Sequence, residues 1–168
     1  SAASDVYKRQ MKIHGDAPGS LLEFSAWSQG VSELAFIVDA GALEQQLAVA
    51  LRFAPHVQLV DSPVPAALTA LCEGRASAAR AELGVKFELN SYGQRGIAAR
   101  LRCDRPHQGV ARQWFRSPDV LALLPIAAPE AGASYGLVWS VPEARAEALL
   151  ALDEASFEAA LNDICGAE

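Results

Sequence analysis

The stretch Leu71-Cys72-Glu73-Gly74-Arg75-Ala76-Ser77-Ala78-Ala79-Arg80 carries the strongest indication of fold and function in this 168-residue sequence. A carboxylate and a glycine follow an apolar segment, and a helix-like run containing Ser77 and Arg80 begins at once. This order predicts a tight turn and unpaired backbone N–H groups at a helix N-terminus, where a phosphate is stabilised by the helix dipole. Ser77 adds a hydroxyl, and Arg80 adds a planar cation that suits phosphate oxygens. The same residues also fit an ordinary strand–turn–helix junction, so the stretch alone leaves both interpretations open.

This stretch resembles the D-G-x-x-S-x-x-R fingerprint of the flavin-dependent aromatic hydroxylases. In that family the fingerprint lies near the FAD pyrophosphate and the path of NAD(P)H. The resemblance therefore implies that cofactor-binding residues are present here, namely Glu73, Gly74, Arg75, Ser77 and Arg80. Glu73 stands where the family usually has Asp, so its carboxylate reaches one methylene further.

The remaining sequence keeps the motif order of the ubiquinone-biosynthesis hydroxylases, the flavin monooxygenases that oxygenate a polyprenylated phenol ring. Downstream, the matching stretches are Tyr92-Gly93-Gln94, residues 97–103, residues 105–115, residues 121–125 and Leu137-Val138-Trp139-Ser140. Upstream they are residues 15–20, Leu22-Glu23-Phe24 and residues 34–38, followed by Leu43 and Leu47. The resemblance spans residues 11–161, and the shared order of the motifs makes it stronger than any single motif.

The resemblance implies flavin chemistry, in which FAD is reduced by NAD(P)H and reacts with O2 before one oxygen atom is transferred to the phenol ring. Leu124 and Pro125 at a strand end, together with Trp139, are the candidates for the substrate wall. No catalytic acid or base is revealed by the sequence. The implied partners are a small prenylated phenol and O2, with possible peripheral association with the inner membrane or with a ubiquinone-biosynthesis complex.

Two motifs of a complete flavin monooxygenase are missing from the sequence, which predicts an internal fragment of a longer protein. The first is the G-x-G-x-x-G turn that brings backbone amides to the FAD pyrophosphate. The second is G-D-A-A-H near the flavin ring, which residues 15–19 imitate without a preceding apolar strand or a following His. Residues 1–10 match nothing in the family and are interpreted as a non-native, adapter-derived segment.

Composition and charge exclude several functional classes. The formal net charge of −6 argues against nucleic-acid binding, which requires a basic surface. No apolar run approaches the roughly 18 residues needed to span a bilayer, and no signal peptide is visible. The cysteines, which are Cys72, Cys103 and Cys165, lack C-x-x-C spacing, so neither a disulfide framework nor a metal site is expected. A cytoplasmic protein is the natural interpretation.

Apolar periodicity predicts alternating strands and helices along the chain. Strands are expected at residues 34–38, 57–60, 66–72, 97–103, 110–115, 120–124 and 135–141. Helices are expected after residue 40, over residues 76–83, from a capping box at residues 140–143 to residue 150, and after an Asp153 cap. Gly84 is expected to end the second helix in the left-handed conformation.

The predicted fold class is α/β (α+β), with part of a FAD-binding Rossmann-like domain joined to an antiparallel β-sheet substrate domain. Residues 11–84 are assigned to the partial FAD-binding domain and residues 85–168 to the sheet and its following helices. Two other classes remain open. One is another flavoprotein of the same superfamily, such as a halogenase or a reductase. The other is a stand-alone β-sheet module that uses Trp114 and Trp139 as an apolar platform for a lipid or a protein partner.

Overall fold

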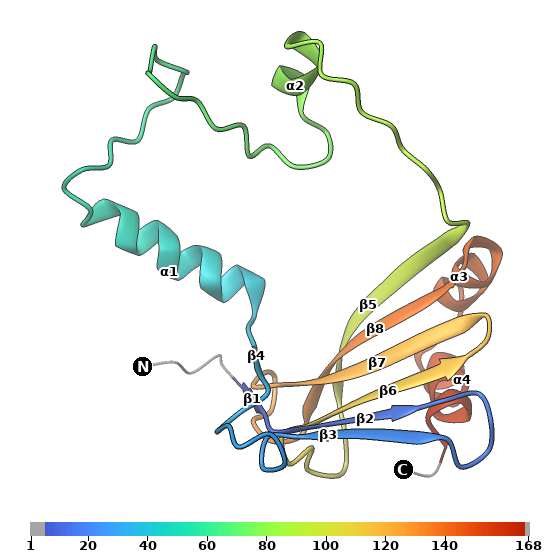
Figure 1. The fold of residues 1–168 in the computed structure, drawn as a ribbon. Coiled ribbons are helices and arrows are strands. Elements are labelled where there is room, and N and C mark those ends of the chain that lie inside the picture. The colour runs from blue at the N-terminus through green and yellow to red at the C-terminus, as the bar shows by residue number, and fades with distance from the viewer. Residues whose placement is uncertain (1–5, 167–168) are drawn as a thin grey trace.

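The computed structural model describes residues 6–166, which form a mixed α/β fold built on one large, mostly antiparallel sheet (Figure 1). Its six strands lie in the order β3-β2-β6-β7-β8-β5, and β1 pairs separately with β4. The strands are β1 (Val6–Lys8), β2 (Gln10–His14), β3 (Leu21–Ser25), β4 (Ala35–Ile37), β5 (Gln94–Arg102), β6 (Val110–Arg116), β7 (Asp119–Ile126) and β8 (Ser134–Pro142). The helices are α1 (Ala40–Arg52), α2 (Ala78–Glu82), α3 (Glu143–Leu150) and α4 (Glu154–Cys165).

The register of the sheet determines which side chains share a face. In β7 and β8, Leu121 lies opposite Trp139 and Leu123 opposite Leu137. All neighbouring strands of the large sheet run antiparallel except β2 and β6, which pair in parallel. Because strand side chains alternate between faces, Leu121, Leu123, Leu137 and Trp139 point to one side and their sequence neighbours to the other.

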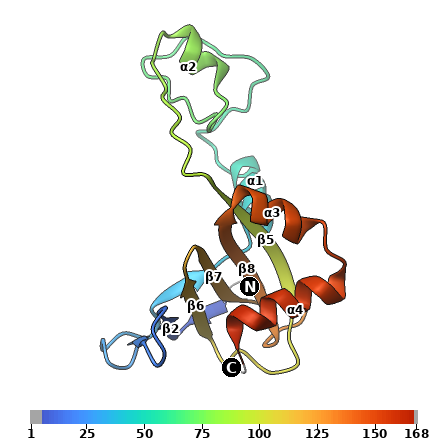
Figure 2. The ribbon, with the colours of Figure 1, turned by 90° about the vertical axis from the view of Figure 1, so that its right-hand side faces the viewer.

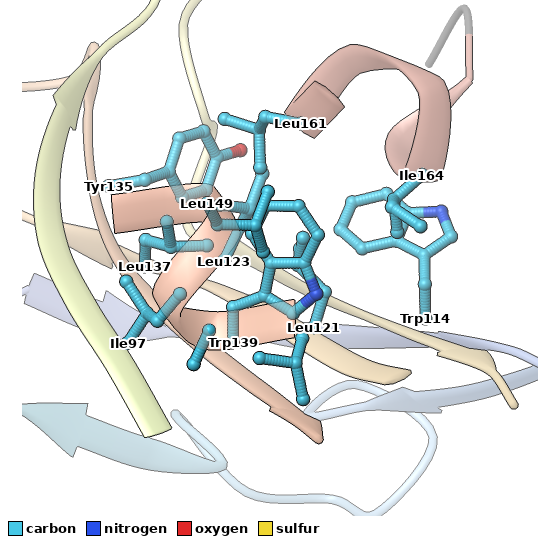
Figure 3. Close-up of a cluster of buried hydrophobic side chains, with 12 residues drawn as sticks. Ile97, Trp114, Leu121, Leu123, Tyr135, Leu137, Trp139, Leu149, Leu161 and Ile164 are labelled. Atoms are coloured by element: carbon cyan, nitrogen blue, oxygen red, sulfur yellow. The ribbon is translucent and has the colours of Figure 1, made fainter. Parts of the chain in front are cut away.

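Helices α3 and α4 cover one face of the sheet (Figure 2). Between them lies the hydrophobic core, in which large side chains of four strands meet apolar residues of the two helices (Figure 3). Its members are Ile97, Trp114, Leu121, Leu123, Tyr135, Leu137, Trp139, Val141, Ala146, Leu149, Leu161 and Ile164. The four late strands predicted from the alternating sequence are confirmed, and so is their antiparallel pairing.

We call the opposite face of the sheet the open face. Helices α3 and α4 do not cover it (Figure 2), and most of its side chains are apolar. The register assigns to it the side chains of Met11, Ile13, Leu22, Phe24, Phe115, Val120, Ala122, Leu124, Ile126 and Val138. Leu22, Phe24, Phe115 and Val138 are exposed. The small β1–β4 ribbon contacts β7, so part of this side is screened by the N-terminal strands.

Local signals in the sequence explain several helix boundaries. The Asp153 carboxylate accepts a hydrogen bond from the backbone N–H of Ser156 at 2.9 Å, as predicted for the cap of α4. Gly84 has φ +68°, which confirms the left-handed residue after α2. The capping box predicted at residues 140–143 is wrong. Ser140 lies within β8 and donates to Gln94 Oε1 at 2.7 Å, so Pro142 caps α3 without a side-chain bond.

Residues 53–93, which we call the arm, connect α1 to β5 and stand away from the sheet (Figures 1 and 2). The strands predicted at residues 57–60 and 66–72 are wrong, because the structure contains no strand between α1 and β5. Apolar side chains of the arm are exposed, with Leu68 at 86% and Tyr92 at 94%. A strand requires a hydrogen-bonding neighbour, and the arm passes beside none.

The N-terminal segment is part of the sheet structure. β1 pairs with β4, and β2 joins β3 to β6, so residues 10–25 and 94–142 belong to one sheet. Residues 15–19 form the turn between β2 and β3, where Gly15 N–H donates to the carbonyl of Ser20 at 3.0 Å. The origin of residues 1–10 and the assignment of residues 11–84 to a FAD-binding domain remain predictions.

Candidate functional site

The fingerprint residues form a compact turn at the start of α2. Ser77 is the N-cap, and its Oγ accepts a hydrogen bond from the backbone N–H of Arg80 at 3.0 Å. Gly74 has φ +73°, a backbone conformation that an L side chain rarely adopts, so glycine is required to make the turn. The predicted tight turn before a helix is therefore present, although α2 is short.

The Glu73 carboxylate lies at the beginning of α2 and accepts hydrogen bonds there, one of them from the N-cap residue Ser77. Its Oε2 accepts from Ser77 Oγ at 2.6 Å and from the backbone N–H of Ala79 at 3.3 Å. The extra methylene of Glu relative to Asp gives the carboxylate the reach to return to the helix start. A negative charge at this position is favourable because it lies near the positive end of the helix dipole.

Arg80 folds back over the same turn. Its guanidinium donates to the carbonyl of Arg75 at 2.7 Å and to the carbonyl of Gly74 at 3.4 Å. The guanidinium carbon also lies 4.0 Å from the ring centre of Phe87, in cation–π geometry. The structure therefore brings together all five residues predicted for cofactor binding, with Ser77 buried and the Arg75 side chain exposed.

The geometry does not make this turn a complete phosphate site. Two amides that a phosphate would use, those of Ala79 and Arg80, already donate to Glu73 and Ser77. The exposed Arg75 guanidinium is suited to binding phosphate oxygens in a bidentate manner, whereas Arg80 would first have to release the carbonyls of Gly74 and Arg75. The residues present thus do not fit FAD as a self-contained site, and a pyrophosphate would have to displace Glu73 or be held mainly by other residues.

The three residues predicted for a substrate wall lie on different faces of the sheet. Leu124 points to the open face, whereas its neighbour Pro125 and also Trp139 point to the face covered by the helices. Pro125 is fully buried beside the core. Only Leu124 of the three is therefore placed beside an apolar surface that a ligand could reach, and the substrate role of all three remains a prediction.

Trp139 is held at the centre of the core by specific contacts (Figure 3). Its indole packs edge-on against Phe157 at 5.9 Å between ring centres, and its exposure is 0%. The indole Nε1–H donates to Asp119 Oδ2 at 3.2 Å, and Arg145 Nε donates to the same oxygen at 2.8 Å. Asp119 is 3% exposed, so this carboxylate links β7, β8 and α3 from within the core.

A polar cluster occupies the other end of the covered face. Arg112 donates to the Tyr135 hydroxyl at 2.7 Å, and His107 packs edge-on against the Tyr135 ring. Burial is the main cause that lowers the pKa of His107. A backbone hydrogen bond with Ile126 raises this pKa and the nearby Arg112 cation lowers it, so the net shift is downward. Burial, with the charge of Cys103 adding to it, raises the pKa of Cys165 to about 11. The neutral imidazole and protonated thiols are therefore suited to packing rather than to nucleophilic chemistry.

The sequence did not predict a cavity between the start of α1 and the end of β7. It has a volume of about 350 Å³ and is lined by Asp39, Gly41, Ala42, Gln45, Ile126, Ala127 and Ala128. Asp39 caps α1 by accepting from the backbone N–H of Ala42 at 3.0 Å, and its other oxygen pairs with Arg100 of β5. An Asp directly before an apolar-periodic helix signals the cap, but its proximity to β7 follows only from the tertiary fold.

The fingerprint and the sheet are separate in space. In both views α2 lies at the far end of the arm, away from β7 and β8 (Figures 1 and 2). The predicted cofactor-binding and substrate-binding groups are therefore not brought together within the described residues. Among those residues, no cluster of three or more His, Cys, Asp or Glu side chains could hold a metal ion. No helix of the described range is both long enough and apolar enough to cross a membrane.

Comparison with known proteins shows a similarity over part of the chain. No protein-family model matches the chain. The chain is similar to the ubiquinone biosynthesis monooxygenase COQ6, mitochondrial, of Danio rerio, with 31% identity over 122 residues. The alignment covers 64% of this chain but 24% of the zebrafish protein, so the chain spans about a quarter of the length of that relative. This is a distant and partial similarity to a monooxygenase.

Proposed function

We propose that this chain is part of an FAD- and NAD(P)H-dependent monooxygenase that hydroxylates a polyprenylated phenol ring in ubiquinone biosynthesis. The observation that carries the proposal is the similarity to the zebrafish monooxygenase over 122 residues. The order of motifs along residues 11–161 supports the same assignment, because it includes the Glu-Gly fingerprint as well as the strands of the sheet.

In this proposal the arm would contribute to holding the cofactor and the sheet would contribute to holding the substrate. The arm carries Arg75 and Arg80, whose cations suit the phosphates of FAD or NAD(P)H. The open face carries Leu124 within an apolar surface of the kind that a prenylated ring requires. Trp139 and Pro125 would act beneath this surface by keeping the strands rigid. When bound, the flavin would supply the oxygen-transfer chemistry.

The location of the protein belongs to the same proposal. A polyprenylated phenol partitions into lipid, so peripheral association with the inner membrane or with a ubiquinone-biosynthesis complex would give access to it. The name of the zebrafish relative places that protein in mitochondria. A cytoplasmic enzyme at the membrane surface and a mitochondrial enzyme both fit this chemistry.

The test is oxygen incorporation by the enzyme encoded by the uninterrupted reading frame. The purified enzyme would be supplied with NAD(P)H, ¹⁸O2 and a phenol that carries a short prenyl chain. One ¹⁸O atom is expected in the new ring hydroxyl and the other in water, while NAD(P)H is oxidised. With chloride also present, a chlorinated product would instead identify a halogenase. Reduction of an added electron acceptor by NAD(P)H, with no labelled hydroxyl, would identify a reductase.

The matched variants for this test are Arg80→Ala and Arg105→Ala. Loss of a charge-assisted phosphate contact costs about 1.5–3 kcal/mol, so Arg80→Ala is expected to weaken FAD or NAD(P)H binding by roughly ten- to hundred-fold. Arg105 lies exposed in the β5–β6 connection, and its replacement is expected to leave the cofactor affinities unchanged. Equal affinities in the two variants would contradict the role of the fingerprint. The 168-residue chain alone is expected to retain no stoichiometric flavin after gel filtration.

The alternative function, a stand-alone β-sheet module that binds a lipid or a protein, cannot use the Trp114 and Trp139 platform expected from the sequence. Trp114 and Trp139 are 2% and 0% exposed beneath the helices, so they cannot form an external platform. A binding module would have to use the open face, where Phe115 and Val138 are exposed.

A further inference from the structure

We infer that the cavity between α1 and the end of β7 holds the head of a phenol whose ring carries no carboxylate. The inference rests on the proposed function, and it specifies which kind of ring the enzyme would accept. It follows from the position of the cavity beside the open face, from the charge of its lining, and from a carboxamide that no other described residue engages.

The cavity continues the apolar row of the open face. Ile126 lines it, and Leu124, two residues earlier on β7, points to the same side of the sheet. Its volume of about 350 Å³ lies at the lower end of the range for ligand pockets, which is about 300–1,000 Å³. A ring with a short side chain suits this volume, whereas a polyprenyl chain would extend along the open face. The cavity and the open face can therefore take the head and the tail of one substrate.

The lining leaves room for a ring because most of its members have small side chains. Gly41, Ala42, Ala127 and Ala128 contribute no group larger than a methyl. Gly41 also allows α1 to begin close to its cap, since a Cβ at this position would lie 3.3 Å from Asp39 Oδ1. A mostly apolar wall with few polar groups is typical of sites that bind aromatic ligands.

The charge of the lining disfavours an acidic ring. Among the described residues that line the cavity, Asp39 is the charged one. Its carboxylate accepts a hydrogen bond from the Ala42 N–H at 3.0 Å and pairs with Arg100. Arg100 does not itself line the cavity, so the described lining offers no unpaired cation to a substrate carboxylate. A ring carboxylate would lie beside Asp39 without a counter-charge of its own, and opposed like charges weaken binding.

Gln45 supplies a neutral polar contact for the ring hydroxyl. It lies on α1 and lines the cavity, and its carboxamide forms no hydrogen bond with another described residue. A carboxamide can donate to the phenol oxygen or accept its hydroxyl proton. Because the rest of the lining is mostly apolar, one such contact would fix the orientation of the ring. Gln46, the next residue of the same helix, does not line the cavity.

The test compares two rings with the enzyme encoded by the uninterrupted reading frame. One is an ortho-prenylated phenol, and the other is the same ring with a carboxylate para to the hydroxyl. Binding is measured by calorimetry, and hydroxylation is measured as kcat/KM with NAD(P)H and O2. The phenol is expected to bind and to react at least about ten-fold better. Asp39→Asn keeps an oxygen to cap α1 but removes the negative charge, so it is expected to reduce this preference by about ten-fold.

Gln45→Leu and Gln46→Leu are the matched pair for the hydroxyl contact. Gln45→Leu is expected to raise the KM for the phenol by about two- to ten-fold because one hydrogen bond is lost, whereas Gln46→Leu should leave this KM unchanged. Equal effects of the two variants, or tighter binding of the carboxylated ring, would overturn the inference. Hydroxylation of neither ring would contradict the proposed monooxygenase, while the calorimetric comparison would still decide which ring the cavity accepts.

Discussion

We call the six-stranded sheet together with α3 and α4 the sheet unit. The sheet unit and the arm have similar proportions of apolar residues, yet only the sheet unit builds a core. In β7 and β8, alternate residues such as Leu121 and Trp139 lie opposite each other, and α3 and α4 close over them. In the arm, Leu59 and Leu68 meet no second layer, so they remain exposed. The difference shows that apolar content predicts burial only where a second element of matching shape is available.

The largest expected difference between the two regions is the response to loss of a large side chain. Trp139→Ala removes a fully buried indole and is expected to lower the free energy of unfolding by about 3–5 kcal/mol. Leu68→Ala in the arm is expected to change it by less than about 0.5 kcal/mol. Urea unfolding measures both, and comparable losses would show that the arm has a core of its own.

A smaller loss in the free energy of unfolding is expected when Asp119, whose carboxylate joins β7, β8 and α3, is replaced. Asp119→Ala leaves the buried indole N–H of Trp139 without an acceptor, which costs about 1–3 kcal/mol. Asp119→Asn keeps an oxygen at that position and is the matched control, since Arg145 is half-exposed and can turn to water. The free energies of unfolding should fall in the order wild type, Asp119→Asn, Asp119→Ala. A neutral Asp119→Ala would show that the bond to Trp139 adds nothing to stability.

The pH dependence of stability should be specific to the sheet unit. Because burial lowers the pKa of His107, the unfolded chain binds a proton at a higher pH than the folded chain does. The contribution of neutral His107 to the free energy of unfolding is therefore fully present above the unfolded pKa of about 6.5. This contribution is lost as the pH falls toward the pKa of His107 in the folded chain. His107→Gln is expected to flatten this part of the stability profile, and His56→Gln in the arm is the control. An unchanged slope in His107→Gln would refute the role of burial.

The smallest expected effect on stability is that of Arg80→Ala. Its guanidinium joins two carbonyls of the arm and the ring of Phe87, none of which contacts the hydrophobic core. The free energy of unfolding of the sheet unit should change by less than about 0.5 kcal/mol, even where cofactor affinity falls in the longer enzyme. A loss above 1 kcal/mol, about five-fold in the folding equilibrium, would show that the arm is coupled to the sheet.

The sequence predicted best those elements whose partners follow closely along the chain. Strands β5 to β8 and the cap at Asp153 are signalled by local alternation and by one side chain, and they formed as expected. Residues 57–60 and 66–72 have strand-like composition, but no neighbour supplies their backbone hydrogen bonds. Ser140 matched a capping box, yet pairing of β8 with β5 drew it into the sheet beside Gln94. In each failure, a long-range contact or its absence prevailed over a local signal.

The candidate site was predictable only in part for the same reason. The turn made by Glu73, Gly74 and Ser77 is local, so its geometry could be read from the order of residues. The separation of Leu124 from Pro125 and Trp139 depends on which face α3 and α4 cover. The cavity beside Asp39 depends on where α1 meets the end of β7. Neither arrangement leaves a signal in a single sequence.

The parallel pairing of β2 with β6 has a consequence during synthesis of the protein. Gln10 to His14 of β2 lie opposite Val110 to Trp114 of β6, so this pairing must wait until the chain has grown past β6. At about 5–20 residues per second, the delay is roughly 5–20 s. Throughout that interval the β2–β3 hairpin has no third strand, and an isolated hairpin is marginally stable in water. Strands β2 and β3 therefore gain their third strand only after β6 has been made, and until then β2 has no hydrogen-bonding neighbour on its β6 side.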